Sequence, residues 1–278
     1  KKSTMKTKST LILLGAVGLF LACTTNPFTG KKTLALVPNS QILPMAFQQY
    51  DAFLSENNVV TNTSEALMVK RVGEKIKNAS ETWLNANGYS GYTSDYRWEY
   101  NLVQDDQINA WCMPGGKIVV YTGILPITQD EAGLAAVMGH EVAHALANHG
   151  QQRMSAGQLQ QIGAVAGTIA VSGSSQETQQ IFGTAYCLGT QFGVMLPFSR
   201  SHETEADIIG QQIMAIAGYE PLEAVELWQR MKANSGGQAP PEFMSTHPSS
   251  DTRINNLQAN ADNARAEARR FGVTSFKR

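Results

Sequence analysis

Two histidines stand four residues apart with a glutamate between them, in the segment His140-Glu141-Val142-Ala143-His144. Residues four apart lie on one face of a helix, so both imidazoles can reach a single zinc ion at about 2.0–2.1 Å. Zinc lowers the pKa of a bound water to about 7, and a neighbouring glutamate can take a proton from that water. The spacing therefore predicts a hydrolytic zinc centre, with His140 and His144 as metal ligands and Glu141 as general base.

The sequence around the motif favours this interpretation over a buried helix that merely contains two histidines. The segment Thr128–Glu131 matches a capping box, which begins a helix ahead of the motif. Apolar Leu134, Val137 and Met138 then recur at helical spacing. We expect the helix to run to about Asn148 and to present the motif at its middle.

A catalytic zinc site also needs a third protein ligand and an open position for water. Glu203 and Asp207 are four residues apart and share a helix face, so one carboxylate can bind the metal while the other orients a ligand imidazole. Spacing alone does not single out Glu203, because its neighbours offer similar ligands. The candidates for the third ligand are Glu203, Glu205, His202, His149 and His247.

These motifs together resemble the gluzincin metallopeptidase family that contains the CAAX prenyl proteases, the HtpX heat-shock proteases and the mitochondrial Oma-type proteases. The matching segments are His140-Glu141-x-x-His144, Glu203-x-x-Ala206-Asp207, His247-Pro248 with Arg253 after it, and Asn109–Ile118 before the catalytic helix. The similarity covers about residues 60 to 260 and is strongest to the periplasmic and Oma-like branch. It implies that Glu203 is the third ligand and that each chain binds one Zn²⁺. The chain departs from the CAAX proteases in lacking clear transmembrane helices.

The resemblance also implies roles for residues around the metal. Related periplasmic members place a loop histidine over the zinc, so His247 is expected to gate the site or to donate to the transition state. A turn residue before Pro248 is the alternative. Arg253 is expected to neutralise Asp207 or to hold the transition-state oxyanion, and an arginine on a helix surface is the alternative.

The elements that position these residues are mostly helices. Apolar residues recur at helical spacing from Gln41 to about Lys77, and further helices are expected at about 199–218 and 221–232. Tyr96–Val103 and Lys117–Tyr121 have the composition of strands. We therefore expect an α+β fold: a mainly helical, zincin-like metalloprotease domain over residues 41–278, with a small sheet whose edge strand flanks the active-site helix.

Residues 157–197 are low in charge and rich in glycine. Close helix packing is the expected structure for this segment, and a lid or a membrane-touching segment is the alternative.

We expect Gly116, Lys117, Ile118 and Val119 to belong to the edge strand beside the catalytic helix. An extended polypeptide would add to such an edge through backbone hydrogen bonds, which tolerate many sequences. This predicts an endopeptidase that acts on unfolded segments.

Residues 1–22 have the pattern of a signal peptide. Several lysines precede the apolar run Leu11–Ala22, which is shorter than the ~20 residues of a transmembrane helix. Ala22-Cys23 after that run resembles a bacterial lipobox, which predicts lipidation of Cys23 and a polar tether over residues 23–40. No aspartate follows Cys23, so the resemblance implies anchoring to the outer membrane on its periplasmic side. An ordinary secretory signal is the alternative.

The composition narrows the possible partners. The net charge of −1 gives no basis for nucleic-acid binding by bulk electrostatics. The three cysteines are too few for a disulfide scaffold, and Cys112 and Cys187 form either one bridge or two free thiols.

The leading hypothesis is a membrane-anchored zinc endopeptidase that hydrolyses unfolded or misassembled envelope proteins, alongside the envelope assembly machinery. The alternative is a zinc-binding, chaperone-like quality-control factor with a mostly occluded site.

Overall fold

The computed structural model describes residues 23–234, 242–248 and 251–278, and the expected signal peptide, residues 1–22, lies outside them. The described residues divide into two compact units. The larger unit contains Leu43–Ala147 and Ser199–Arg278, with the expected metal ligands. The smaller unit contains residues 23–42 and Asn148–Phe198.

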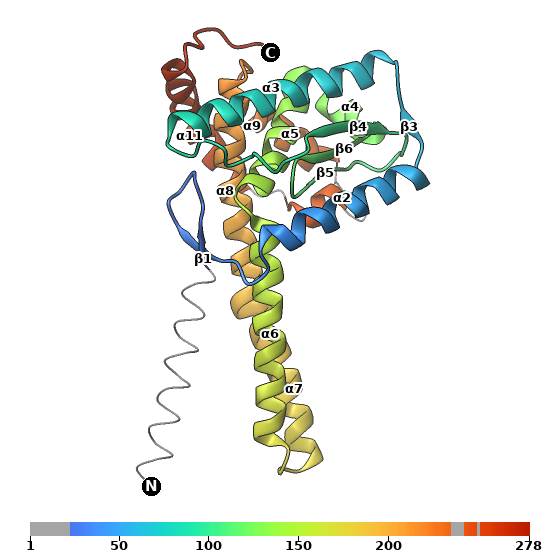
Figure 1. The fold of residues 1–278 in the computed structure, drawn as a ribbon, viewed down its shortest axis with the longest axis vertical. Helices are drawn as coiled ribbons and strands as arrows, with labels where there is room; N and C mark the ends of the chain where they lie inside the picture. The colour runs from blue at the N-terminus through green and yellow to red at the C-terminus, as the bar shows by residue number, and fades with distance from the viewer. Residues whose placement is uncertain (1–22, 235–241, 249–250) are drawn as a thin grey trace. The chain divides into compact units, whose positions relative to one another are not determined.

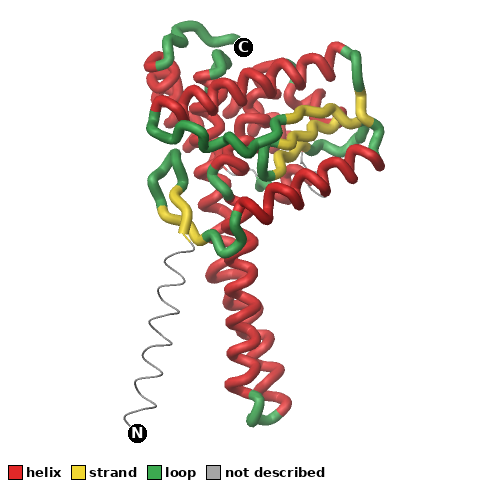
Figure 2. The backbone as a smooth tube through the Cα atoms, viewed as in Figure 1, coloured by secondary structure: helices red, strands yellow, loops and turns green. Residues whose placement is uncertain are grey.

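Helices make up most of the larger unit, which also holds a small sheet (Figure 1, Figure 2). Its helices are α3 (Ser64–Ala86), α4 (Leu125–Thr128), α5 (Glu131–Leu146), α9 (Glu223–Asn234), α10 (Glu242–Thr246) and α11 (Asp251–Arg270), a 3-10 turn η1 (Thr122–Ile124), and most of α2 (Asn39–Glu56) and α8 (Leu196–Ile216). Its strands are β3 (Val59–Val60), β4 (Glu99–Val103), β5 (Ala110–Met113) and β6 (Lys117–Tyr121). This arrangement confirms the predicted α+β class.

The order of the strands corrects one prediction. The sheet runs β3-β4-β6-β5, with β4 and β6 parallel and the other pairs antiparallel. The expectation that Gly116, Lys117, Ile118 and Val119 belong to an edge strand is wrong, because β4 and β5 occupy the two sides of β6. All five residues of β6 are buried. The two edge strands are β3 and β5, and β5 is the one that contacts α5.

Helix α5 passes through the core, and all of its residues are buried. Its N-cap is Asp130, whose carboxylate accepts hydrogen bonds from two backbone N–H groups of the first turn. The capping box expected over Thr128–Glu131 is wrong, because Thr128 ends α4 and its hydroxyl donates to the carbonyl oxygen of Leu125. Between the two helices, Gln129 turns the chain with a φ of 68°.

Two glycines let α5 and α8 approach closely. A Cβ added to Gly139 would lie 2.9 Å from the carbonyl oxygen of Gly210, and a Cβ added to Gly210 would lie 2.7 Å from the backbone nitrogen of His140. A side chain at either position would therefore push the helices apart. The close approach brings the carboxylates of α8 to the histidines of α5.

The smaller unit contains a helical hairpin. Helix α6 (His149–Val171) is followed by α7 (Gln176–Thr190) and a π-helical turn, η2 (Gln191–Met195), before α8 begins. The run Gln176–Ile216 is long and apolar enough to cross a membrane by length and composition alone, and no residue of its apolar window is buried. Within the described residues, one helix is therefore long and apolar enough to cross a membrane, whereas the sequence predicts no clear transmembrane helix.

Residues 23–40, expected to form a tether, include a short antiparallel strand pair, β1 (Cys23–Thr25) and β2 (Lys32–Leu34). The first turns of α6 hold the chain that follows β2. The side chain of Gln151 donates to the carbonyl oxygen of Val37, and the hydroxyl of Ser155 accepts from the backbone N–H of Leu36.

Candidate metal centre

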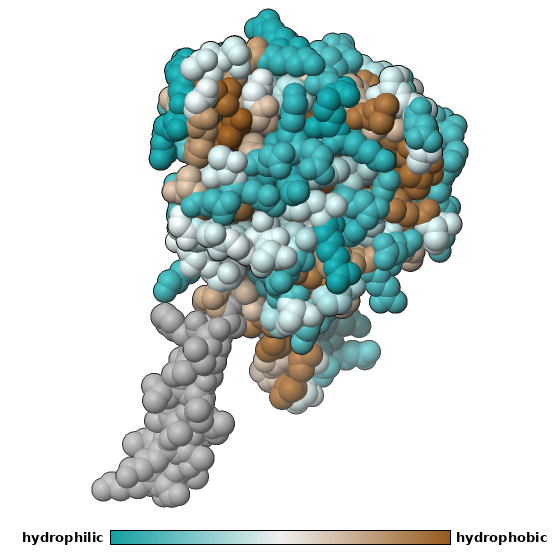
Figure 3. Space-filling view, turned by 45° about the horizontal axis from the view of Figure 1, so that its top comes forward, coloured by the Kyte–Doolittle hydropathy of each residue, from teal (hydrophilic) through white to brown (hydrophobic). Residues whose placement is uncertain are grey.

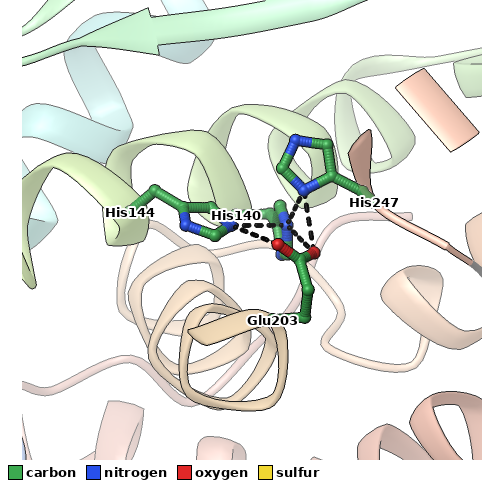
Figure 4. Close-up of side chains that lie close together, drawn as sticks. All are labelled: His140, His144, Glu203 and His247. Carbon is green, nitrogen blue, oxygen red and sulfur yellow. Dashed lines mark hydrogen bonds and ion pairs between the residues drawn. The ribbon is translucent and has the colours of Figure 1, made fainter. Parts of the chain in front are cut away.

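Four side chains from three parts of the larger unit converge on one point (Figure 4). His140 and His144 come from α5, Glu203 comes from α8, and His247 directly follows α10. One ligand atom from each lies within 4.8 Å of every other. Among the described residues, this is the only group of histidine, cysteine and acidic side chains with that arrangement.

The distances between these atoms fit a tetrahedral metal site. His140 Nε2 lies 3.1 Å from His144 Nε2 and 3.4 Å from Glu203 Oε2, and His144 Nε2 lies 3.3 Å from Glu203 Oε1. Ligand atoms around one tetrahedral zinc ion, each about 2.0–2.1 Å from it, lie about 3.3–3.4 Å from one another. Two imidazoles and a carboxylate are also a donor set that zinc prefers. The residues therefore fit a zinc ion.

The centre is buried, which perturbs its titratable groups. Burial lowers the pKa of His144 well below its usual value, which favours the neutral imidazole that a metal requires. Burial raises the pKa of Glu203, but hydrogen bonds to His140, His144 and His247 outweigh that effect and hold it well below the usual range. Glu203 is therefore a carboxylate, the form that binds a cation.

Asp207 lies behind one of the ligands. His140 Nδ1 faces Asp207 Oδ1 at 3.0 Å, which orients the ring so that Nε2 points to the convergence point. Burial lowers the pKa of His140, but the carboxylates of Asp207 and Glu203 outweigh burial and raise this pKa to about 9. Of the two carboxylates, Asp207 faces Nδ1, the nitrogen that does not bind the metal, and so strengthens His140 as a ligand.

Arg253 is a buried residue of the centre, so the alternative of an arginine on a helix surface is wrong. Its guanidinium donates two hydrogen bonds to Asp207, at 2.7 and 2.6 Å, and Nη1 lies 3.2 Å from Glu203 Oε2. The guanidinium also stacks 3.9 Å from the ring centroid of Trp228. Burial raises the pKa of Asp207, but Arg253 outweighs burial and keeps that carboxyl ionised.

Glu141 and His247 lie on the other side of the ligands. Glu141 is 4% exposed, and its Oε1 lies 3.4 Å from His247 Nε2. His247 Nδ1 lies 3.2 Å from His140 Nε2 and 2.8 Å from Glu203 Oε2. His247 thus occupies the side of the convergence point that faces Glu141.

The other candidate ligands do not join this group. Glu205 is partly exposed on α8, and His202 is buried but absent from the cluster. His149 begins α6 in the smaller unit. Of the five candidates for the third ligand, the structure brings Glu203 and His247 to the two histidines of α5.

Two aromatic residues of the centre were not found from the sequence. Trp228 lies 5.8 Å from His140 and 5.7 Å from Phe243, measured between ring centroids, and Phe243 lies 4.8 Å from His247. Phe243 precedes His247 by four residues, and its carbonyl oxygen accepts from the His247 backbone N–H. That spacing was the available signal for Phe243, whereas Trp228 looks like any buried residue of a helix.

The helical fold, the paired histidines on α5 and the glutamate from α8 define a gluzincin-type metallopeptidase domain. The chain belongs to peptidase family M48, whose sequence profile matches residues 74–261.

Several relatives are similar to this chain. This chain is 40% identical over 167 residues to the mitochondrial metalloendopeptidase OMA1 of Schizosaccharomyces pombe. The aligned region covers 59% of this chain and 47% of that protein. This chain is 28% identical over 255 residues to the beta-barrel assembly-enhancing protease of Yersinia pestis. The aligned region covers 86% of this chain and 51% of that protein. The chain spans about half the length of these relatives.

Proposed function

We propose that this protein is a zinc-dependent metalloendopeptidase. The observation that carries the proposal is the spacing of 3.1–3.4 Å among the two imidazole Nε2 atoms of His140 and His144 and the two carboxylate oxygens of Glu203. The carboxylate of Glu141 lies on the side of this group where His247 is found. The three ligands would hold one zinc ion. When bound, zinc supplies a Lewis acid that activates water and polarises the carbonyl of the scissile bond.

The protein's own residues transfer the proton and orient the metal ligands. Glu141 is the general base that takes the proton of the attacking water and passes it to the leaving amine. Asp207 fixes the tautomer and direction of His140. Arg253 holds Asp207 through two hydrogen bonds and, being engaged there, positions the ligands rather than contacting the oxyanion.

The substrate is an extended polypeptide that adds to the outer edge of β5. Tyr121 N donates to Asn109 O, so these residues form a hydrogen-bonded pair at the end of the β5–β6 ladder. Such pairs alternate along antiparallel strands. The register then turns the backbone N–H and C=O of Ala110 and Cys112 away from β6. Because β5 contacts α5, a peptide on this edge would pass the catalytic residues.

His247 gates the site in this proposal. Its imidazole lies on the side of the ligands that faces Glu141, where the attacking water and the scissile carbonyl must meet. Movement of His247 away from Glu203 would uncover that position. The same contact supports the second candidate function, a zinc-binding, chaperone-like factor in which the site stays covered and binding matters more than cleavage.

We place the substrates among unfolded or misassembled proteins of a bacterial envelope, alongside its assembly machinery. The name of the Yersinia pestis relative, a beta-barrel assembly-enhancing protease, supports the link to assembly machinery. The lipobox-like Ala22-Cys23 supports the envelope as the location. A lipid on Cys23, which is exposed at the start of β1, would anchor the chain to the outer membrane from the periplasm.

Zinc content and casein cleavage, measured together for the parent chain, Glu141→Gln and Glu205→Gln, test the proposal. Glu205→Gln is the matched control, because it makes the same change on α8 outside the cluster. We expect about one zinc per chain in all three and cleavage in all but Glu141→Gln. Zinc without cleavage in the parent would favour the chaperone-like function, and so would full cellular function of Glu141→Gln. The absence of zinc from the parent would refute the metal centre.

A further inference from the structure

The hairpin of the smaller unit carries most of the exposed large hydrophobic residues of the described chain. Among the described residues, eleven large hydrophobic residues are exposed, and nine of them lie from Met154 to Val194. None of residues 156–198 is buried. Figure 3 shows hydrophobic residues at the surface of this hairpin, whereas the visible face of the larger unit has separate hydrophobic patches among hydrophilic and neutral residues. Exposed apolar surface of this extent marks a site of interaction.

The hairpin helices pack on each other through small residues and leave their apolar stripes outside. A Cβ on Gly163 would lie 2.2 Å from Tyr186, and a Cβ on Gly167 would lie 2.0 Å from Phe182, so these glycines form the α6–α7 contact. At ~100° per residue, the exposed apolar residues of α6 fall within an arc of about 140° that lies away from these glycines. They are Met154, Leu159, Ile162, Val165 and Ile169, and they are 40–68% exposed.

The distribution of charge selects the partner. Between Arg153 and Arg200 the chain has one charged residue, Glu177, which lies in the first turn of α7 beside the polar connection 172–175. Arg153 and Arg200 are both exposed at the two ends of this segment. Uncharged apolar helices suit hydrocarbon, and basic residues at their ends suit anionic phospholipid headgroups. The length also agrees, because Met154–Val171 spans ~27 Å as a helix and a bilayer core is ~30 Å thick.

We propose that the hairpin of residues 154–198 inserts into a phospholipid bilayer. Arg153 and Arg200 then lie at the headgroups, and the apolar stripes of α6 and α7 contact acyl chains. This gives the protein a membrane contact separate from Cys23, and two such contacts hold a protein on a membrane more stably than a single lipid chain. The inference does not depend on the proposed peptidase activity.

The chain offers its own reporter position for the test. Cys187 is exposed on α7, whereas burial raises the pKa of the Cys112 thiol well above its usual value and slows its labelling. An environment-sensitive fluorophore is attached to Cys187 in the full chain with Cys23→Ser. The labelled protein is mixed with vesicles of phosphatidylcholine and phosphatidylglycerol that contain acyl-chain spin labels. We expect blue-shifted emission and strong quenching by the spin-labelled chains.

Two leucines give matched variants. Leu188 on α7 and Leu67 on α3 are 53% and 54% exposed. Leu188→Glu places a charge in the hydrocarbon, so the lipid concentration needed for half-maximal quenching should rise at least tenfold. Leu67→Glu should leave that concentration unchanged. A reporter at Leu67→Cys, with Cys187→Ser, should not be quenched. Ile169→Glu repeats the test on α6 if Leu188→Glu does not fold, as judged by circular dichroism.

Three results would overturn the proposal. The first is a Cys187 reporter that acyl-chain labels do not quench. The second is vesicle binding that high salt reverses and Leu188→Glu leaves intact, which would indicate contact with headgroups only. The third is an oligomer in lipid-free sedimentation that Leu188→Glu converts to a monomer, with no quenching by lipid, which would make a second copy of the chain the partner.

Discussion

His247 Nδ1 lies 2.8 Å from Glu203 Oε2, the carboxylate that we assign to the metal. On its other side, His247 Nε2 lies 3.4 Å from Glu141 Oε1. One imidazole therefore contacts both the proposed third ligand and the proposed base. The attacking water and the scissile carbonyl need the position that His247 occupies. The site is therefore covered in this structure, and His247 must move before turnover.

If His247 covers the site, His247→Ala should increase casein cleavage severalfold and should also speed the removal of zinc by a chelator. The second readout matters because it does not depend on catalysis. Loss of cleavage with unchanged chelation would show that His247 instead donates to the transition state. Unchanged cleavage and unchanged chelation would reduce His247 to a turn residue before Pro248.

The pair formed by Arg253 and Asp207 should matter greatly for stability. Both side chains are almost fully buried, at 7% and 2% exposure. Arg253→Ala would leave a buried carboxylate without its partner, which typically costs about 3–5 kcal/mol. The exposed pair Lys232 and Asp251 is the matched control, and Lys232→Ala should cost less than about 1 kcal/mol.

Urea unfolding of the parent and both variants measures these differences in the free energy of unfolding. Equal destabilisation by Arg253→Ala and Lys232→Ala would contradict the structural role of the buried pair. Zinc content measured beforehand shows whether Arg253→Ala also weakens the metal site through Asp207.

Part of the centre could be predicted from the sequence because helical spacing fixes which side chains share a face. That argument placed His140 with His144, and Glu203 with Asp207. Selecting Glu203 over its neighbours needed the family resemblance, because spacing cannot bring two distant helices together. The contact of Gly139 with Gly210 does so in the structure, and single glycines in helices give no such signal.

The errors had physical causes in the neighbouring elements. The run Lys117–Tyr121 has no alternation of polar and apolar residues, which is the pattern of a strand buried on both faces and not of an edge strand. Thr128 matched a cap by composition, but the positive φ of Gln129 ends one helix there and Asp130 caps the next. Neither strand order nor the sign of φ at Gln129 is encoded in the local pattern.

A proline at the edge strand should block substrate without unfolding the sheet. The N–H of Cys112 points away from β6, so Cys112→Pro removes a donor to the substrate and no bond of the ladder. We expect cleavage to fall severalfold with zinc content unchanged. Cys112→Ala should retain activity, which separates the backbone effect from the loss of the thiol.

Ile118→Pro provides the contrasting result. Ile118 is fully buried inside the sheet between β4 and β5, so proline there removes a ladder bond and should unfold the protein. Circular dichroism and zinc content distinguish the two outcomes. Full cleavage by Cys112→Pro would show that the substrate does not add to β5.

Glu131, the first residue of α5, should make stability depend on acid pH. Burial raises its pKa, but hydrogen bonds from Lys277 and Arg71, and the charges of both, outweigh it and lower the pKa from 4.5 to about 2. Because the folded-state pKa is the lower one, this contribution to stability is complete above pH 4.5 and disappears as the pH falls towards 2. Glu131→Gln removes the titrating group, so the variant should be less stable than the parent near pH 7. The urea midpoints of the two proteins should then converge between pH 4.5 and 2, and a constant difference across that range would show that Glu131 acts through packing rather than through its charge.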